Sequence, residues 1–273
     1  MSDAIVEVVL RRDRLIIMAA LIALTALAWG DLWWLAGDMA MGGMDMTGFR
    51  MVPAGIGMMM PAAAPWAPME FGFVFAMWAV MMVGMMTPSV APMILLYARV
   101  GRQAVTKNEP FAPAIWFLAG YLASWAAFSL AATLAQWGLE RAALLTPMME
   151  GSSVILGGCV LIAAGIYQWT PLKTACLRQC QAPWSFLQRY GGFRREGKGA
   201  LALGARHGFY CIGCCWTLMA LLFVGGVMNL FWIAALAAIV LVEKVVPAGR
   251  LIARIIGVGL MASGAWLLAT AAR

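Results

Sequence analysis

Residues 207–229, HGFYCIGCCWTLMALLFVGGVMN, form an apolar run that begins with the only histidine and three of the six cysteines of the chain. A helix of about 20 mostly apolar residues crosses the roughly 30 Å hydrocarbon core of a membrane. The chain of 273 residues is 64% hydrophobic and 11% charged, whereas soluble domains are about 25% charged. The stretch therefore predicts a membrane helix that starts with soft metal ligands.

Comparable apolar runs occur at about 15–36, 71–97, 113–136, 152–170, 231–247 and 254–271. With 208–229 they predict an all-α fold, a polytopic integral membrane helix bundle with seven spans, in which residues 1–273 form a single membrane domain. The run 231–247 is short and holds Glu243 and Lys244 near its end. If this run is re-entrant, the bundle has six spans.

The basic residues predict the orientation of these spans. If the N-terminus is cytoplasmic, 16 of the 19 Lys and Arg lie in or beside inner segments, and only Arg50, Arg141 and Arg273 lie outside. Short cytoplasmic segments of membrane proteins carry such an excess of positive charge. The N-terminus is therefore expected inside and the C-terminus outside. The net charge of +7 indicates orientation rather than binding to nucleic acid.

Two connecting segments are long. The outer loop, residues 37–70, is rich in Met and Gly and has no steady helical or strand period. The inner loop, residues 171–206, is basic, holds a pair of cysteines and is expected to contain a short helix around 184–190. No soluble domain is expected in either loop.

Methionine is concentrated in one part of the chain, with 15 of the 22 between residues 39 and 93. Thioethers favour Cu(I), and they remain ligands in an oxidising compartment where a thiol is lost. The outer loop is therefore a candidate arm for the capture of Cu(I) or Ag(I). Methionine is also a flexible apolar residue that fills irregular gaps, which is the alternative explanation.

The second span continues this pattern as MWAVMMVGMMTPSVAPM, residues 77–93. Its helical spacing predicts a ladder of thioethers along one side of the span. The candidate ligands are Met81, Met82, Met85 and Met86. Pro88 and Pro92 are expected to kink the helix and to free carbonyl groups. A packing or lipid-facing methionine surface with a proline kink fits the same spacing.

Five of the six cysteines fall between residues 176 and 215, on the predicted cytoplasmic side, where disulfides are uncommon. Four candidate ligands occur at helical positions i, i+4, i+7 and i+8 and would share a face. They are His207, Cys211, Cys214 and Cys215, and Cys176 and Cys180 form a second pair. The helix N-terminus and the nearby Arg178 and Arg206 are expected to favour thiolates.

These cysteines leave four alternatives open. They are a copper-type site, a structural zinc site formed by four thiolates (Cys176, Cys180, Cys211 and Cys214), thiol redox chemistry, and plain packing. Cys159 lies beside two glycines in the middle of a span, which favours packing. Glu243 and Lys244 are expected to reach the membrane interface, or to pair with each other or with a neighbouring helix.

Four stretches together resemble a bacterial family of metal-binding integral membrane proteins whose domain has no assigned function. They are MWAVMMVGMMTPSVAPMILLYA (77–98), YQWTPLKTACLRQCQAP (167–183), GARHGFYCIGCCWTLMALLFVGGVMN (204–229) and LVEKVVPAGR (241–250). The resemblance covers roughly residues 70–271. It implies a location in a bacterial inner membrane, with the outer side in the periplasm, and a bound metal. The residues that match the family's motifs are Cys176, Cys180, His207, Cys211, Cys214 and Cys215. The resemblance implies no settled substrate or reaction.

The sequence favours a metal transport or binding protein over an enzyme. The first hypothesis is inward movement of Cu(I) or Ag(I) from the methionine arm, along the second span, to the inner Cys and His ligands. The second is a membrane-bound copper chaperone that supplies a partner cuproenzyme or exchanges metal with a soluble copper chaperone. The third is a thiol–disulfide oxidoreductase. Copper is the expected ion, with zinc as the alternative.

Overall fold

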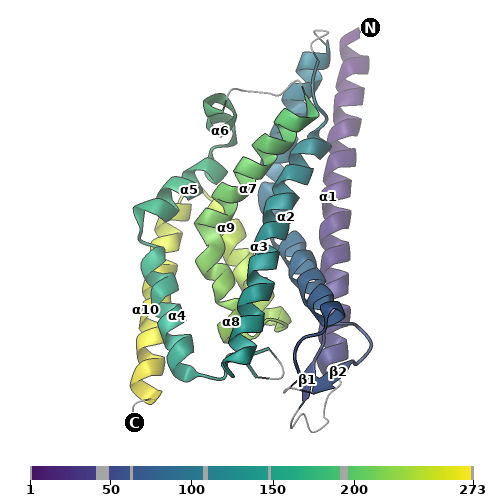
Figure 1. Ribbon diagram of the computed structural model, residues 1–273. Helices are drawn as coiled ribbons and strands as arrows, with labels where there is room; N and C mark the ends of the chain where they lie inside the picture. The colour runs from purple at the N-terminus through teal and green to yellow at the C-terminus, as the bar shows by residue number, and fades with distance from the viewer. Residues whose placement is uncertain are drawn as a thin grey trace.

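The computed structural model describes residues 2–40, 49–61, 64–106, 110–146, 149–190 and 196–271. Within these ranges the chain is a bundle of helices with one short hairpin (Figure 1). The helices are α1 (Ser2–Ala40), α2 (Pro68–Thr106), α3 (Ala114–Arg141), α4 (Val154–Tyr167), α5 (Pro171–Gln181), α6 (Pro183–Arg189), α7 (Gly197–Ala220), α8 (Leu222–Gly225), α9 (Leu230–Val245) and α10 (Gly249–Ala271). Strands β1 (Phe49–Met51) and β2 (Met59–Pro61) pair antiparallel. The two termini lie at opposite ends of the bundle.

Five helices are long and apolar enough to cross a membrane, and the bent pair α4 and α5 raises this number to six if the pair forms one span. These helices are compatible with a membrane protein. The seven predicted spans are not confirmed. The run 231–247 corresponds to α9, which has 16 residues and measures about 24 Å at 1.5 Å per residue. That length is less than the roughly 30 Å of a bilayer core.

The two predicted loops contain more regular structure than the sequence suggests. Residues 171–206 include α5, α6 and the first part of α7, and α6 coincides with the short helix expected around 184–190. The helices α4 and α5 meet at an angle of 65°, because Pro171 begins a new helix and the Thr170 hydroxyl caps it by accepting a hydrogen bond from Lys173 N. The outer loop 37–70 contains the strands Phe49–Met51 and Met59–Pro61 and the start of α2. Its residues 41–48, with three of the nine methionines of the expected arm, lie outside the described residues.

Helix α2 passes through the bundle as one continuous helix with Pro88 and Pro92 inside it. Side-chain hydroxyl groups bind the backbone next to the first proline, since Thr87 donates to Val83 O at 2.7 Å and Ser89 donates to Met86 O at 2.9 Å. Hydroxyl groups of this kind satisfy carbonyl oxygens near a proline in an apolar environment. The methionine-rich segment is helical along its whole length, although Pro88 and Pro92 cannot donate to the carbonyl oxygens of Gly84 and Pro88.

Helices α3 and α7 pack with their backbones in close contact. A Cβ atom at Gly120 would lie 1.9 Å from Leu201 O, and a Cβ atom at Gly204 would lie 1.9 Å from Phe117 O. Only glycine fits at these two positions, since small residues let helix backbones approach each other. This contact sets α7, with its cysteines, against α3.

The hairpin lies at the end of the bundle opposite the N-terminus (Figure 1). Arg50 of β1 fixes it to the start of α2 through a bidentate ion pair with Glu70, at 2.6 and 2.9 Å. Arg50 also donates to Pro61 O and Ala64 O, each at 2.9 Å. The hydrogen bond to Glu70 raises the pKa of the Arg50 guanidinium, and such paired forks are among the stronger hydrogen bonds in proteins.

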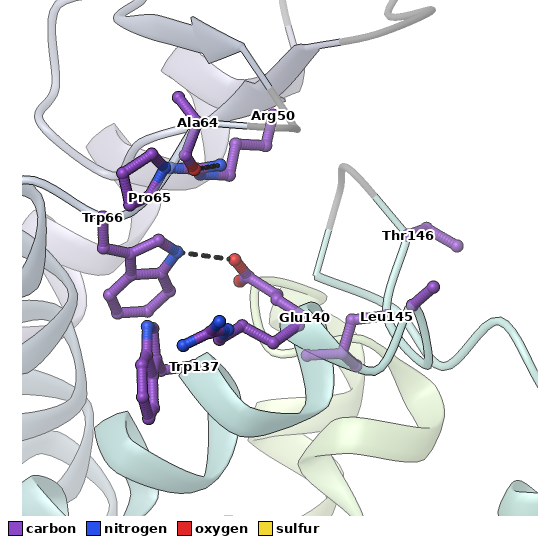
Figure 2. A pocket seen from close by; sticks show the side chains of 10 residues that line it. Arg50, Ala64, Pro65, Trp66, Trp137, Glu140, Leu145 and Thr146 are labelled. Carbon is purple, nitrogen blue, oxygen red and sulfur yellow. Dashed lines mark hydrogen bonds between the residues drawn. The ribbon is translucent and has the colours of Figure 1, made fainter.

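A cavity of about 690 Å³ lies beside this ion pair. Figure 2 shows the Trp66 indole, which lines this cavity, pointing at the Glu140 carboxylate, to which it donates a hydrogen bond of 2.9 Å. Gln136 donates to the same carboxylate at 3.0 Å. The described residues that line the cavity include no cysteine or methionine. Its lining therefore offers no soft ligand for copper.

Candidate metal site

Four cysteines meet where α5 packs against α7, and we call them the thiol cluster: Cys180, Cys211, Cys214 and Cys215. Helical spacing puts the last three on one face of α7. The Cys180 side chain lies close enough to Cys211 and Cys214 to interact with both. The thiols of Cys214 and Cys215 donate to the backbone oxygen of Cys211 at 3.0 and 2.9 Å. The α7 cysteines are at most 2% exposed. The structure therefore brings residues from both predicted cysteine motifs together.

Cys176 lies next to this cluster but does not share its thiol contacts. A Cβ atom at Gly213 would lie 2.8 Å from the Cys176 sulfur, so this side chain packs against the backbone of α7. Among the described residues, no three His, Cys, Asp or Glu side chains stand at the spacing of a preformed metal centre. A soft site that combines thiols with methionine differs from such a centre, because thioethers also bind Cu(I).

Lys244 of α9 places a positive charge among the sulfur atoms. Its Nζ lies 2.8 Å from Cys211 Sγ, 3.8 Å from Met86 Sδ and 4.0 Å from Cys215 Sγ. Ser89 Oγ also lies near the ammonium, 3.4 Å from Nζ. The lysine is 5% exposed, and a charged side chain is rarely buried to this extent unless it is paired. Sulfur atoms from α2 and α7 thus surround one buried cation.

Tyr121 of α3 contacts Cys211, which is the cysteine nearest to Lys244. Its hydroxyl lies 3.1 Å from Cys211 Sγ and 3.3 Å from the carbonyl oxygen of Met86. It therefore connects α3 to both α7 and α2. A buried tyrosine hydroxyl usually has a hydrogen-bond partner, and here the partners belong to the candidate site.

The four predicted methionine ligands all lie inside the bundle. Met81, Met82, Met85 and Met86 are at most 1% exposed. Their burial excludes a lipid-facing surface, which was one alternative for this span. Together with the buried Met77 and Met93 they form a thioether column along α2, and Met86 is the member that reaches the neighbours of Lys244. Packing and metal binding both require this inward orientation.

His207 lies among aromatic rings on α7, about one helical turn before Cys211. Its ring centre lies 4.9 Å from that of Phe186 and 5.9 Å from that of Phe117. The imidazole is 3% exposed, and its Nδ1 has no hydrogen-bond partner among the described residues. Buried polar atoms are usually satisfied by protein or solvent, so an unpartnered Nδ1 is a candidate ligand position in the tautomer that carries its proton on Nε2.

Glu243, which neighbours Lys244 in sequence, points to a different helix. It pairs with Lys173 of α5 at 2.6 Å, and it accepts a hydrogen bond from Gln168 at 3.2 Å. Gln181 also donates to the backbone carbonyl of Glu243 at 2.8 Å. The carboxylate therefore connects α9 to the α5 helix that carries Cys180. The sequence left open whether Glu243 and Lys244 reach the membrane interface, pair with each other or pair with a neighbouring helix. In the structure both are buried and both contact neighbouring helices.

Two expectations about the charges near the cysteines are wrong. The ligands do not begin a helix, because α7 starts at Gly197, well before His207. The helix dipole acts within the first turn only, so it does not reach Cys211. Arg178 and Arg206 are exposed, and Arg206 stacks on the Tyr190 ring at 4.6 Å. Lys244 supplies the positive charge that was expected from these groups.

Sequence reasoning missed Lys244 and Tyr121 as members of the site. The signal for Lys244 was present, because an ionisable residue in an apolar segment is costly and is usually functional. No local pattern points to Tyr121, whose contact with Cys211 spans 90 positions in the chain.

A model of the PpoB2 family, described as a copper chaperone, matches residues 75–267. The match covers more than half of the chain and includes the thioether column, the thiol cluster, His207 and Lys244. No significant match was found among curated proteins or among solved structures. The chain therefore belongs to the PpoB2 copper chaperone family, which supports copper as its ligand.

Proposed function

We propose that this chain is a membrane-bound copper chaperone that holds Cu(I) at the thiol cluster and Met86 and delivers it to a partner cuproenzyme. Its setting is a bacterial inner membrane, with the N-terminus in the cytoplasm and the C-terminus in the periplasm. The observation that carries the proposal is the set of three sulfur atoms, from Met86, Cys211 and Cys215, within 4.0 Å of one buried cation.

The charge and softness of this position favour a monovalent soft metal. The position accommodates the single positive charge of the Lys244 ammonium, and the surrounding acceptors are mostly sulfur. Thiolate and thioether ligands select Cu(I) over hard cations. Ag(I) shares its charge and is the natural probe for the site. The flexible lysine side chain can withdraw when the metal arrives.

His207 and Cys180 complete the proposed ligand set. Cys180 reaches the cluster from α5, and His207 Nδ1 is a buried acceptor without a partner among the described atoms. Neutral imidazole is a common copper ligand. Ligands on separate helices let a small movement of α5 change the number of sulfur atoms around the metal, which suits a protein that must release its cargo.

The metal content of the purified protein tests this proposal. The triple variant Cys211→Ser, Cys214→Ser, Cys215→Ser is compared with wild type and with Cys159→Ser after loading with Cu(I) under reducing conditions. Cys159 is exposed on α4 and serves as the matched control. We expect copper in wild type and in the control, and little in the triple variant. Equal copper in all three folded proteins would contradict the proposal.

Movement of Cu(I) across the membrane is a second candidate function. The observation that favours it is the buried thioether column, which follows α2 through the bundle. Vesicles that contain the protein and an internal Cu(I) chelator distinguish the two functions. Transport predicts accumulation of copper inside, reduced by Met81→Leu and Met85→Leu. A chaperone predicts that copper binds to the protein without entering the vesicle.

A further inference from the structure

We propose that a groove between α1 and α2 binds one anionic diacyl phospholipid. Its phosphate would lie against Arg14, Arg99 and Arg102, and one acyl chain would lie along the apolar part of the same groove. The site lies at the end of the bundle that carries the N-terminus (Figure 1), and it is separate from the thiol cluster. It does not depend on copper binding.

The polar part of the groove is a cavity of about 270 Å³ lined by arginines from both helices. Arg14 comes from α1, and Arg99 and Arg102 come from α2. The Nε of Arg102 is buried and has no hydrogen-bond partner among the described residues. Guanidinium groups bind phosphate through paired hydrogen bonds. A phosphate in this cavity would satisfy the free Nε–H.

The apolar part is a second cavity, of about 320 Å³, between the same two helices. Its walls include Met18 and Ile22 of α1 and Pro88, Ala91 and Leu95 of α2. Leu95 lines both cavities, so the two adjoin at this residue. Small residues on each helix leave the space open.

Helical spacing aligns the two cavities along one direction. Arg14, Met18 and Ile22 recur every four residues on α1, as Ala91, Leu95 and Arg99 do on α2, and residues at this spacing share a face. The distance from Arg99 to Pro88 along the helix is about 16 Å. This is about half of the roughly 30 Å hydrocarbon core, which is the depth of one leaflet.

The occupant follows from this combination of charge and depth. An apolar groove one leaflet deep fits an acyl chain, whereas a soluble anion would leave it empty. The arginines at its polar end favour a lipid with net negative charge over a zwitterionic lipid, because basic pockets between membrane helices retain anionic head groups. Phosphatidylglycerol has both required features.

Native mass spectrometry of the full chain in detergent micelles tests the site. Phosphatidylglycerol is the probe, phosphatidylcholine with identical chains is the charge control, and inorganic phosphate is the soluble competitor. We expect one retained phosphatidylglycerol per chain. The double variant Arg99→Gln, Arg102→Gln should weaken its binding about tenfold or more, because charge-assisted hydrogen bonds are lost. Ala26→Trp, which fills the exposed side of the apolar cavity, should weaken it as well.

Arg250→Gln is the matched control, because Arg250 is an exposed arginine on α10 outside both cavities. It should bind phosphatidylglycerol as wild type does. Equal retention of phosphatidylcholine, or equal loss in Arg250→Gln, would overturn the proposal in favour of unspecific lipid contact. Displacement of the lipid by inorganic phosphate would show an anion site without lipid specificity. Thermal unfolding of each variant, followed by tryptophan fluorescence, reports whether it is folded.

Discussion

The contact between Lys244 and Cys211 makes a quantitative prediction for the metal-free protein. The thiol sulfur is the nearest acceptor of the ammonium, at 2.8 Å, and the next, Ser89 Oγ, is at 3.4 Å. Cys211→Ala therefore leaves the buried ammonium with only the longer contacts to Ser89, Met86 and Cys215. Hydrogen bonds to charged groups contribute about 1.5–3 kcal/mol, and an unsatisfied charged group costs at least as much. We expect Cys211→Ala to lower the free energy of unfolding by about 3 kcal/mol.

The second half of this prediction removes the charge. Lys244→Met replaces the ammonium by a side chain of similar length, so Cys211→Ala in that background should cost about 1 kcal/mol, the order expected for a small loss of packing. Reversible unfolding in mixed detergent micelles, followed by tryptophan fluorescence with a copper chelator present, measures all four proteins. Cys215→Ala is the control, since its sulfur lies 4.0 Å from Nζ. The four proteins form a double-mutant cycle. If the changes in unfolding free energy caused by Cys211→Ala and Lys244→Met add within about 0.5 kcal/mol, the contact is refuted.

Three further predictions concern the column, the ion pair and the helix contact. Met86→Leu should preserve stability within about 1.5 kcal/mol but weaken Ag(I) binding in calorimetric titrations, and Met69→Leu, at an exposed position, should leave both stability and Ag(I) binding unchanged. Glu243→Gln should lower the free energy of unfolding by about 3–5 kcal/mol, because it leaves the Lys173 charge buried; additional replacement of Lys173 by Met should restore most of this loss in the same unfolding assay. Gly204→Ala should cost at least about 1–3 kcal/mol, because the new Cβ would lie 1.9 Å from a backbone oxygen of α3; unchanged thermal unfolding would contradict this packing.

The helical class was predictable because apolar runs of span length occur throughout the chain. The inward orientation of Met81 and Met85 could not be chosen from sequence, since a periodic methionine face fits either lipid or core. The start of α7 was misplaced for a physical reason. Hydropathy locates the apolar part of a helix, whereas α7 begins at Gly197, in a segment whose Ala and Leu residues favour helix outside the apolar run.

The two cysteine motifs were expected to share a site, and Cys180 does meet the α7 thiols. The partner of Lys244 was not predictable, because Lys244 and Cys211 are 33 positions apart in the chain and lie on different helices. Local pattern shows that a buried lysine needs a partner, but only the packing of α9 against α2 and α7 chooses one. Glu243 illustrates the same limit, since it pairs with Lys173 rather than with its sequence neighbour.

X-ray absorption at the copper K-edge is the most direct test of the proposed site. The wild-type protein, loaded and kept under reducing conditions, should give a Cu(I) edge and a first coordination shell dominated by sulfur, with at most one nitrogen from His207. Met86→Leu should reduce the sulfur shell, whereas Cys159→Ser should leave it unchanged. A shell of oxygen and nitrogen ligands in wild type, or an unchanged sulfur shell after loss of Cys211 and Cys215, would contradict the account.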